Sequence, residues 1–340
     1  MTAVPRLSIG LPVYNGARYL AGSIEALLGQ SYQDFELIIS DNASTDDTPA
    51  ICRRYEEQDS RIRYFRQQRN IGHVPNHNFL VGKARGEFFK WAAHDDLYAR
   101  DLLKRCVGAL DEHPEAVLAH SWVAMIYDSA TPTKLLRYPV PTASPHPPER
   151  FRSMLYDGMG DYTYAVMRTS VLRRTPLHES FYYADRTLIT ELALHGTFCQ
   201  VEDWLFFRRD RPYEPQKSVR ELCVIFDPRR ANRLRNPTIR LYAEYIWGYF
   251  SAIRRAPLSA EDRRKCYRCL AGWLASRAVP ARNPLGQPVS ARQQPVLFLV
   301  RRLAGAVLPG RDVRVGEPPP TEPPNIAIDS LVPGRDRRSP

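Results

Sequence analysis

Two adjacent aspartates, Asp95 and Asp96, are the residues of this chain best suited to carry out chemistry. They end a short apolar run that begins at Gly86 and is rich in aromatic residues, as is typical of a buried strand. Adjacent carboxylates repel each other unless water or a cation lies beside them. At the end of a strand they would suit a hard divalent metal ion that also binds phosphate oxygens. The alternative is that the pair starts a turn and caps a helix beginning near Tyr98.

Another strand-like run, residues 35–40, also ends in a carboxylate, at Asp41. Because open α/β sheets bind nucleotides at the carboxyl ends of their strands, acids at two such ends indicate a nucleotide-binding edge. A third run, residues 7–13, is followed by Tyr14, whose ring could stack on a nucleobase while Asp41 accepts a base N–H. The alternative is that Tyr14 is a core ring and Asp41 forms a turn.

The elements that must position these residues alternate between strand and helix over the first ~110 residues. This order predicts a parallel sheet with crossover helices. Residues 138–148 contain five prolines, which predicts an irregular loop or lid. The expected strands are 7–13, 35–40, 61–66, 87–92, 115–127, 162–167 and 198–207, and the expected helices are 17–28, 49–58, 74–84, 100–112, 184–195, 239–254 and 260–277.

The composition of the 340 residues fits one large α/β domain with an extension, or two domains. No apolar run approaches the ~18 residues that cross a bilayer, and no secretory signal precedes the first strand. We therefore expect a cytoplasmic protein whose six cysteines are thiols. Cys266 and Cys269 form a C-x-x-C without a second pair, so we do not expect a zinc site.

The formal net charge of +11 comes mostly from Lys and Arg in residues 205–305. Such a basic region suits nucleic acid, anionic lipid or a phosphorylated substrate, or reflects only a preference for Arg. Charge alone does not choose among these.

Four motifs occur in a fixed order along the first half of the chain and sharpen this interpretation. They are Pro12/Tyr14/Asn15, Asp41/Asn42/Ser44/Asp46, Asn70/Gly72 and Ala84/Gly86/Glu87, followed by the aspartate pair. In this order and at these intervals they resemble the inverting glycosyltransferases of family 2, which have the GT-A fold. The resemblance covers roughly residues 5–110 strongly and 150–220 more weakly.

The resemblance implies a role for each matching residue. The donor nucleotide would be bound by Pro12, Tyr14, Asn15, Asp41, Asn70, Gly72 and Asp95. Asp96, together with Asp95, would bind a divalent metal, Mg²⁺ or Mn²⁺, that bridges the diphosphate. Many family members carry a further Asp two positions before the pair, where this chain has Ala93, with His94 following as a histidine that we expect to be structural.

The second half of the resemblance implies a catalytic base. Asp185 stands at the start of an amphipathic helix, and inversion needs a base to take the proton of the acceptor hydroxyl. The alternative is an ordinary helix cap, with Glu191 as the second candidate for the base. The basic loop 208–218 resembles the loop that closes over the diphosphate in the family, with Arg209 and Arg211 as its candidate contacts.

The implied fold is an α/β GT-A, Rossmann-like mixed sheet flanked by helices, with a helical C-terminal extension. The implied domains are 1–220 (GT-A catalytic domain, with 1–110 as the nucleotide-binding half and 111–220 as the acceptor half), 221–315 (helical C-terminal extension) and 316–340 (disordered tail). The implied activity is that of a hexosyltransferase-type enzyme moving a sugar from a nucleotide-diphosphate donor to a hydroxyl acceptor, as in bacterial polysaccharide or glycolipid synthesis.

Two alternatives of different chemistry stay open. A sugar nucleotidyltransferase would need a Gly-rich loop with Arg or Lys after the first strand, and Pro-Val-Tyr-Asn-Gly at 12–16 is not such a loop. A non-catalytic nucleotide- or nucleic-acid-binding protein would use the basic helices instead.

The expected partners are a nucleotide-sugar donor and a glycan or lipid-linked hydroxyl acceptor, with no nucleic acid. The basic, apolar segment 295–307 could make peripheral contact with the inner face of the cell membrane, and packing against the catalytic domain would explain it equally.

Overall fold

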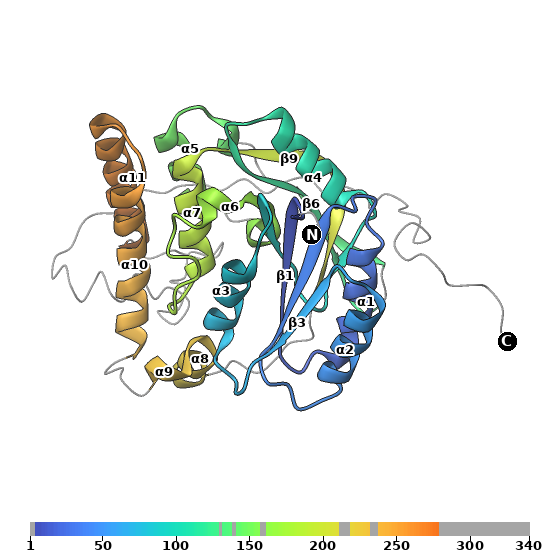
Figure 1. Ribbon diagram of the computed structural model, residues 1–340. Helices are drawn as coiled ribbons and strands as arrows, with labels where there is room; N and C mark the ends of the chain where they lie inside the picture. Colours follow the sequence, from blue (N-terminus) through green and yellow to red (C-terminus); the bar gives the residue numbers. More distant parts are fainter. Residues whose placement is uncertain are drawn as a thin grey trace.

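The computed structural model describes residues 4–128, 131–137, 141–156, 161–210, 218–231 and 237–278. In these ranges a mixed sheet lies between helices (Figure 1). It has nine strands in the order β3-β2-β1-β4-β8-β6-β9-β5, with β7 paired to β6. Its strands are β1 (Leu7–Val13), β2 (Phe35–Asp41), β3 (Ile62–Arg66), β4 (Phe88–Trp91), β5 (Leu97–Tyr98), β6 (Ala116–Ile126), β7 (Pro132–Leu136), β8 (Val166–Arg168) and β9 (Thr197–Arg209).

The first four strands are parallel, and β8 is antiparallel to both of its neighbours, β4 and β6. Every residue of β1 and β2 is buried, because helices cover both faces of this half of the sheet. A strand buried on both faces has a continuous apolar sequence, which is why these two strands are easy to recognise in the chain.

Helices form a layer on each face of the sheet (Figure 1). They are α1 (Ala17–Leu28), α2 (Thr48–Gln58), α3 (His73–Lys83), α4 (Leu102–Glu112), α5 (Pro147–Tyr156), α6 (Thr169–Leu172), α7 (Ala184–His195), α8 (Val219–Phe226), α9 (Pro228–Ala231), α10 (Pro237–Arg255) and α11 (Ala260–Ala278), with short 3₁₀ helices η1 (Pro141–Ala143) and η2 (Tyr162–Tyr164). The apolar sides of α1, α2 and α4 share one core cluster with the sheet, and those of α3 and α7 share another.

A third layer consists of α10 and α11, which pack outside α5 and α7 (Figure 1). The aromatic rings of Tyr245, Tyr249 and Trp273 meet in this interface. Arg255 of α10 also forms a bidentate ion pair with the buried Glu191 of α7, at 2.9 and 2.7 Å. Helices α10 and α11 are therefore joined to α5 and α7 by both apolar packing and a charged pair.

The expected α/β sheet flanked by helices is confirmed, and the expected helices 17–28 and 184–195 have the bounds of α1 and α7. Two expectations were wrong in detail. Residues 162–164 form η2 and the strand starts only at Val166, while the proline-rich stretch contains η1 and the start of α5. Proline is tolerated in the first turn of a helix because the N–H that it lacks has no helical partner there, so Pro147 can begin α5.

The end of the expected extension and the tail 316–340 lie outside the described residues, as does the segment 295–307. Among the helices that the structure describes, none combines the length and the apolar character that a membrane span requires.

Candidate active site

The carboxyl ends of β1, β2 and β3 meet at one edge of the sheet. Val13 pairs with Asp41, and Asp41 pairs with Arg66 on the next strand. Asp41 is fully buried, and it accepts hydrogen bonds from the Ser44 N–H and the Tyr64 hydroxyl, both at 2.8 Å. The Arg66 guanidinium lies 3.4 Å from the same carboxylate. Asp41 thus fixes the loop after β2, and its contact with a nucleobase stays a prediction.

The loop after β1 is tied to the loop after β2 by its own side chains. Pro12 lies inside β1 opposite Ser40. Asn15 has a positive φ of 50°, a conformation that Asn tolerates better than most residues. Its N–H donates to Ser44 Oγ at 2.9 Å, and its side-chain oxygen accepts from the Thr45 N–H at 2.8 Å. Tyr14, just before it, is 46% exposed, so its ring is available to a ligand.

The Asn70/Gly72 motif forms the third side of this edge. Asn42 donates to Asn70 Oδ1 at 3.0 Å, and the Gly72 N–H donates to the same oxygen at 2.9 Å. Gly72 has a φ of +94°, and a Cβ there would lie 2.7 Å from Pro228 and 2.8 Å from the Phe226 carbonyl oxygen. Only glycine fits both constraints, because the α8–α9 junction packs directly on this position.

Asp95 and Asp96 are both buried, at 6% and 2% exposure, where β4 leaves the sheet. Oδ1 of Asp96 accepts the Arg209 N–H at 2.8 Å. Burial raises the pKa of Asp96 to about 7, and the neighbouring charge of Asp95 adds to this shift. The alternative role of the pair, capping the next helix, does not apply, because Asp101 precedes α4 and the two-residue strand β5 lies between.

Arg209 is oriented toward the main chain around the acidic pair. Its Nε donates to the Asp95 carbonyl oxygen at 2.8 Å, and its Nη1 donates to the carbonyl oxygen of Tyr127. The guanidinium also lies 4.5 Å from the centre of the Tyr19 ring. These contacts give Arg209 a positioning role, and the diphosphate contact expected of it stays a prediction. Arg211 lies outside the described residues.

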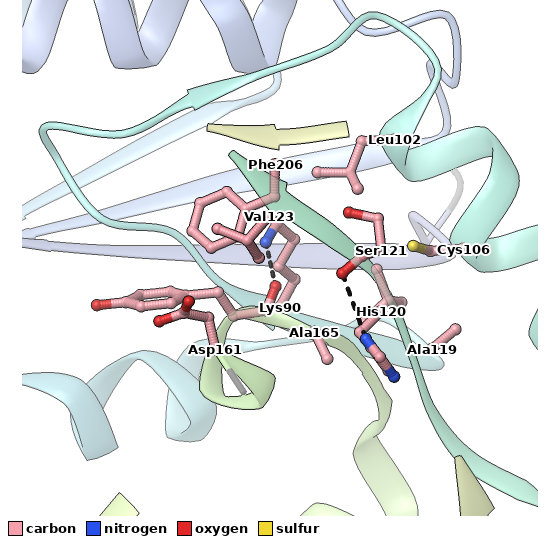
Figure 2. A pocket seen from close by; sticks show the side chains of 12 residues that line it. Lys90, Leu102, Cys106, Ala119, His120, Ser121, Val123, Asp161, Ala165 and Phe206 are labelled. Atoms are coloured by element: carbon pink, nitrogen blue, oxygen red, sulfur yellow. Dashed lines mark hydrogen bonds between the residues drawn. The ribbon is translucent and has the colours of Figure 1, made fainter. Parts of the chain in front are cut away.

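A buried lysine, Lys90, lies on β4 close to the acidic pair. Figure 2 shows its side chain beside the Phe206 ring. Its ammonium group donates a hydrogen bond to the carbonyl oxygen of Tyr164. The ring centres of Tyr98 and Phe206 are 5.1 and 5.4 Å from Nζ. Burial lowers the pKa of Lys90 to about 8, while its charge opposes the rise in the pKa of Asp96. The small cavity beside it, about 10 Å³, is at the lower limit for one water molecule.

Asp185, the expected base, lines a second and larger cavity of about 210 Å³. It lies in the first turn of α7, after Tyr183, whose φ is 56°. The surrounding protein desolvates the carboxylate and raises its pKa, while the backbone N–H of Arg186 opposes the shift. Glu191, the second candidate, is buried in its ion pair with Arg255 and is not among the residues that line this cavity.

Both cavities share Tyr164 and Asp161. Burial raises the pKa of the Tyr164 hydroxyl, and four carboxylates raise it further: those of Asp96, Asp95, Asp161 and Asp185. The charge of Asp161 also raises the pKa of both Asp96 and Asp185. Carboxylates from three distant segments of the chain therefore lie within electrostatic range of one another.

The acidic pair fits a hard divalent cation by the chemistry of its donors. Burial and the charge of Asp95 raise the pKa of Asp96 to about 7, and a cation bound to the pair would offset both effects. Among the described residues, no group of three or more His, Cys, Asp or Glu could hold a metal ion alone. Mg²⁺ is commonly bound by one or two carboxylates, with water and substrate phosphates as its other ligands, so two suffice.

Comparison with known proteins identifies the family. Residues 8–176 match the family model described as Glycosyl transferase family 2. The chain belongs to glycosyl transferase family 2. The match includes all four motifs and the acidic pair, and it ends before Asp185.

Curated relatives match about a third of this family 2 chain. They include an uncharacterised glycosyltransferase of Rickettsia typhi (34% identical over 111 residues, 33% of this chain and 34% of the relative), glycosyltransferase GlyG of Streptococcus pneumoniae serotype 4 (32% over 98 residues, 29% and 33%) and the putative glycosyltransferase EpsE of Bacillus subtilis (35% over 114 residues, 33% and 41%). The chain thus spans less than half the length of each of these relatives.

Solved structures share the fold over a longer range. Residues 1–349 of S. aureus TarS, in complex with UDP-GlcNAc, give a TM-score of 0.51 at 18% identity, covering 80% of this chain and 81% of that chain. A longer structure of the same protein gives a TM-score of 0.50 at 18% identity, covering 87% of this chain and 53% of that chain. The expected GT-A fold is therefore confirmed for this family 2 protein.

The sequence did not single out Asp161, Lys90 or the histidines of the larger cavity. Lys90 had a signal, since it is the one charged residue between two aromatic residues in an otherwise apolar strand. Asp161 had none, because its importance comes from η2, which brings it between the two cavities. His94, expected to be structural, packs its ring on Gly16, where a Cβ would lie 2.6 Å from it.

Proposed function

We propose that this protein is an inverting glycosyltransferase that moves a sugar from a nucleoside-diphosphate donor to a hydroxyl acceptor with the help of a divalent metal ion. The observation that carries the proposal is that the metal-type pair, Asp95 and Asp96, and the candidate base Asp185 all lie within electrostatic range of Tyr164. Family 2 membership and the likeness to TarS, which was solved with UDP-GlcNAc, support a nucleotide-sugar donor.

The two faces of the anomeric carbon of the transferred sugar need opposite chemistry. On the leaving side, Asp95 and Asp96 would hold Mg²⁺ or Mn²⁺, which when bound neutralises the charge that develops on the diphosphate. On the attacking side, Asp185 would accept the proton of the acceptor hydroxyl. As the hydroxyl oxygen bonds to the anomeric carbon, the bond from that carbon to the phosphate oxygen breaks, and the diphosphate leaves with the electron pair.

The raised pKa of Asp185 favours this role. A general base works best when its pKa lies near the operating pH, and an ordinary aspartate is too weak a base for that. The same carboxylate at a solvated helix start would have no reason to be desolvated. This supports Asp185 as the base over its alternative as an ordinary helix cap.

The remaining predicted residues would bind the donor nucleotide. Tyr14 would stack on the base, and Asp41 with Asn70 would form the polar side of the base pocket. Arg209 would hold the acidic pair in position through its hydrogen bonds to Asp96 and to the Asp95 carbonyl oxygen. Its guanidinium would contact the diphosphate only after breaking the bond to that carbonyl oxygen. The cytoplasmic location, the acceptor and a contact with a membrane surface belong to the proposal as expectations.

A ligand screen tests the proposal. UDP, GDP, dTDP and their common sugar esters are added to the protein with and without Mn²⁺ or Mg²⁺, and thermal unfolding is followed. We expect one nucleoside diphosphate to raise Tm only when the metal is present, because ligand binding to the folded state stabilises it. If no nucleoside diphosphate does so, the proposal fails. NMR of the anomeric proton of the product then tests inversion.

A further inference from the structure

The cavity that contains Asp185 has features that select its ligand. It lies between the N-terminal ends of α3 and α7, and its volume of about 210 Å³ is many times the ~10–15 Å³ that one water needs. It therefore has room for a group the size of a sugar ring. Its lining residues are His73, Val74, His77, Asp161, Thr163, Tyr164, His178, Glu179, Phe181, Tyr183, Ala184, Asp185 and Phe226.

The charges of this lining all have one sign. Asp161, Glu179 and Asp185 contribute carboxylates, and none of the described residues that line the cavity is Lys or Arg. Arg208 pairs with Asp161 but is not itself part of the lining. Because a like charge close by is unfavourable, a ligand that carries a carboxylate or phosphate inside this cavity would be repelled.

His178 provides a buried polar atom that lacks a partner. The residue is 7% exposed, and within the described structure its Nε2 has no hydrogen-bond partner. Its backbone is held by Asn78, which donates to the His178 carbonyl oxygen at 2.8 Å and accepts its N–H at 3.1 Å. The ring packs against Trp91 at 4.7 Å and His77 at 5.6 Å. Since buried polar groups are normally paired, this unpaired nitrogen of a residue in the lining is the atom that we expect a ligand hydroxyl to complete.

The state of this imidazole fits a hydroxyl rather than an anion. Burial lowers the pKa of His178 to about 3, so the ring is neutral at physiological pH. A neutral imidazole nitrogen can donate or accept one hydrogen bond, and a hydroxyl group can serve either role. A neutral ring offers no charge to offset that of an anionic ligand.

Aromatic side chains complete the walls. Tyr183 is 49% exposed at the cavity, and Phe181 and Phe226 add apolar surface. Small-molecule sites typically combine such apolar walls with a few polar groups that fix orientation. A sugar ring presents apolar C–H faces and hydroxyl edges, and therefore matches both.

We propose that this cavity binds an uncharged, hydroxyl-bearing sugar ring next to Asp185. It excludes rings that carry a carboxylate, or a phosphate other than the leaving diphosphate of a donor. The inference rests on the proposed function and adds a substrate class to it. The ring belongs either to the donor or to the acceptor, since both must meet beside the base. Uronic acids, and sugars with a phosphate on a ring hydroxyl, are excluded from that position in either case.

Matched ligands test the exclusion. The probes are UDP, UDP-glucose and UDP-glucuronate, and GDP, GDP-mannose and GDP-mannuronate, titrated calorimetrically with Mn²⁺. If the cavity holds the donor sugar, the neutral ester binds at least ~10-fold more tightly than its uronate. If it holds the acceptor sugar, methyl glucoside binds to the protein–nucleotide–Mn²⁺ complex and glucuronate does not. A uronate that binds as tightly as its neutral counterpart in both arms overturns the inference.

Variants separate the inference from a structural effect. Glu179→Lys places a cation in the lining and is expected to improve uronate binding at least ~10-fold relative to the neutral sugar. Glu202→Lys, the same change at an exposed position of β9 outside the lining, is expected to leave the ratio unchanged. If the two variants behave alike, the selectivity does not come from this cavity.

His178→Phe keeps a ring of similar shape and removes Nε2. It is expected to weaken sugar binding several-fold while leaving the affinity for UDP or GDP alone unchanged, and a purely structural effect would weaken both. Should His178→Phe fail to fold, Tyr183→Ala removes an exposed wall of the cavity. It is likewise expected to weaken sugar binding while leaving the affinity for UDP or GDP alone unchanged. Absence of metal-dependent binding of every nucleotide would instead refute the proposed function.

Discussion

The backbone N–H of Arg209 donates a hydrogen bond of 2.8 Å to Oδ1 of Asp96, 113 residues earlier in the chain. The Arg209 side chain reaches back to the Asp95 carbonyl oxygen at the same distance. These bonds exist because β5, which follows the acidic pair, adds to β9 as an antiparallel edge strand. The last strand of the sheet thus fixes the orientation of the predicted metal-binding residues.

Replacing Asp96 tests the metal pair. Asp96→Asn is expected to lower transfer at least ~100-fold and to abolish the metal-dependent rise in Tm, because the cation loses one of two carboxylates. The ligand-free protein is expected to be at least as stable as the parent, since the change removes a repelling buried charge. Asp203→Asn, at an exposed ion pair with Arg105, is the control. Full metal-dependent activity in Asp96→Asn would contradict the assignment.

Replacing Asp185 tests the base. Asp185→Asn is expected to stop turnover while the donor still binds with parent affinity, because the lost group acts only on the acceptor proton. In the parent, kcat/KM is expected to fall as pH drops through a value above the ordinary aspartate pKa, since desolvation raises the pKa of Asp185. Calorimetry with the donor and a pH–rate profile measure both effects. Loss of donor affinity in Asp185→Asn would argue against the base role.

Tyr14 offers a test of nucleobase stacking. Tyr14→Ala is expected to weaken nucleoside-diphosphate binding by about 1–3 kcal/mol, the range for a base stacked on an aromatic ring. The free energy of unfolding should change little, because the ring is 46% exposed. Tyr156→Ala removes a similarly exposed ring on α5 and serves as the control. Equal nucleotide affinities in the two variants would show that Tyr14 does not stack.

The ion pair between Glu191 and Arg255 tests how the extension is attached. Arg255→Ala leaves a buried carboxylate without its partner, which is expected to cost roughly 2 kcal/mol or more in unfolding free energy. Arg240→Ala breaks an exposed pair with Glu244 on the same helix and should cost less than about 0.5 kcal/mol. Urea denaturation of both variants measures the difference. Similar small losses would mean that the α7–α10 contact depends on apolar packing alone.

Buried histidine makes the fold sensitive to acid. Burial lowers the pKa of His120 to about 4, so the unfolded chain takes up a proton near pH 6.5 that the folded protein resists. The contribution of the neutral, buried His120 ring to the free energy of unfolding is complete above pH 6.5 and is lost as pH falls to about 4. At pH 5 the loss is roughly 2 kcal/mol. His120→Phe should show a smaller fall between pH 7 and pH 5 in urea denaturation, and an unchanged fall would rule out this source.

The sequence by itself determined the first part of the sheet, at whose edge we predict that the nucleotide binds. Residues 7–13 and 35–41 are buried on both faces and therefore appear as continuous apolar runs, and the helix between them has a clear period. Because these strands are parallel, the motifs at their carboxyl ends must lie at one edge of the sheet. The parallel order follows from the alternation of strands and helices, so local pattern was sufficient.

Only the tertiary structure decided the other half of the site. The two-residue strand β5 and η2 are too short to leave a periodic signal, yet they orient Asp96 and bring Asp161 beside Tyr164. Glu191 and Asp185 lie on one helix. Only the packing shows that Glu191 forms an ion pair with Arg255 while Asp185 lines a cavity. The desolvation of these carboxylates and their distances from other charges depend on residues far apart in the chain. A local sequence pattern therefore cannot predict them.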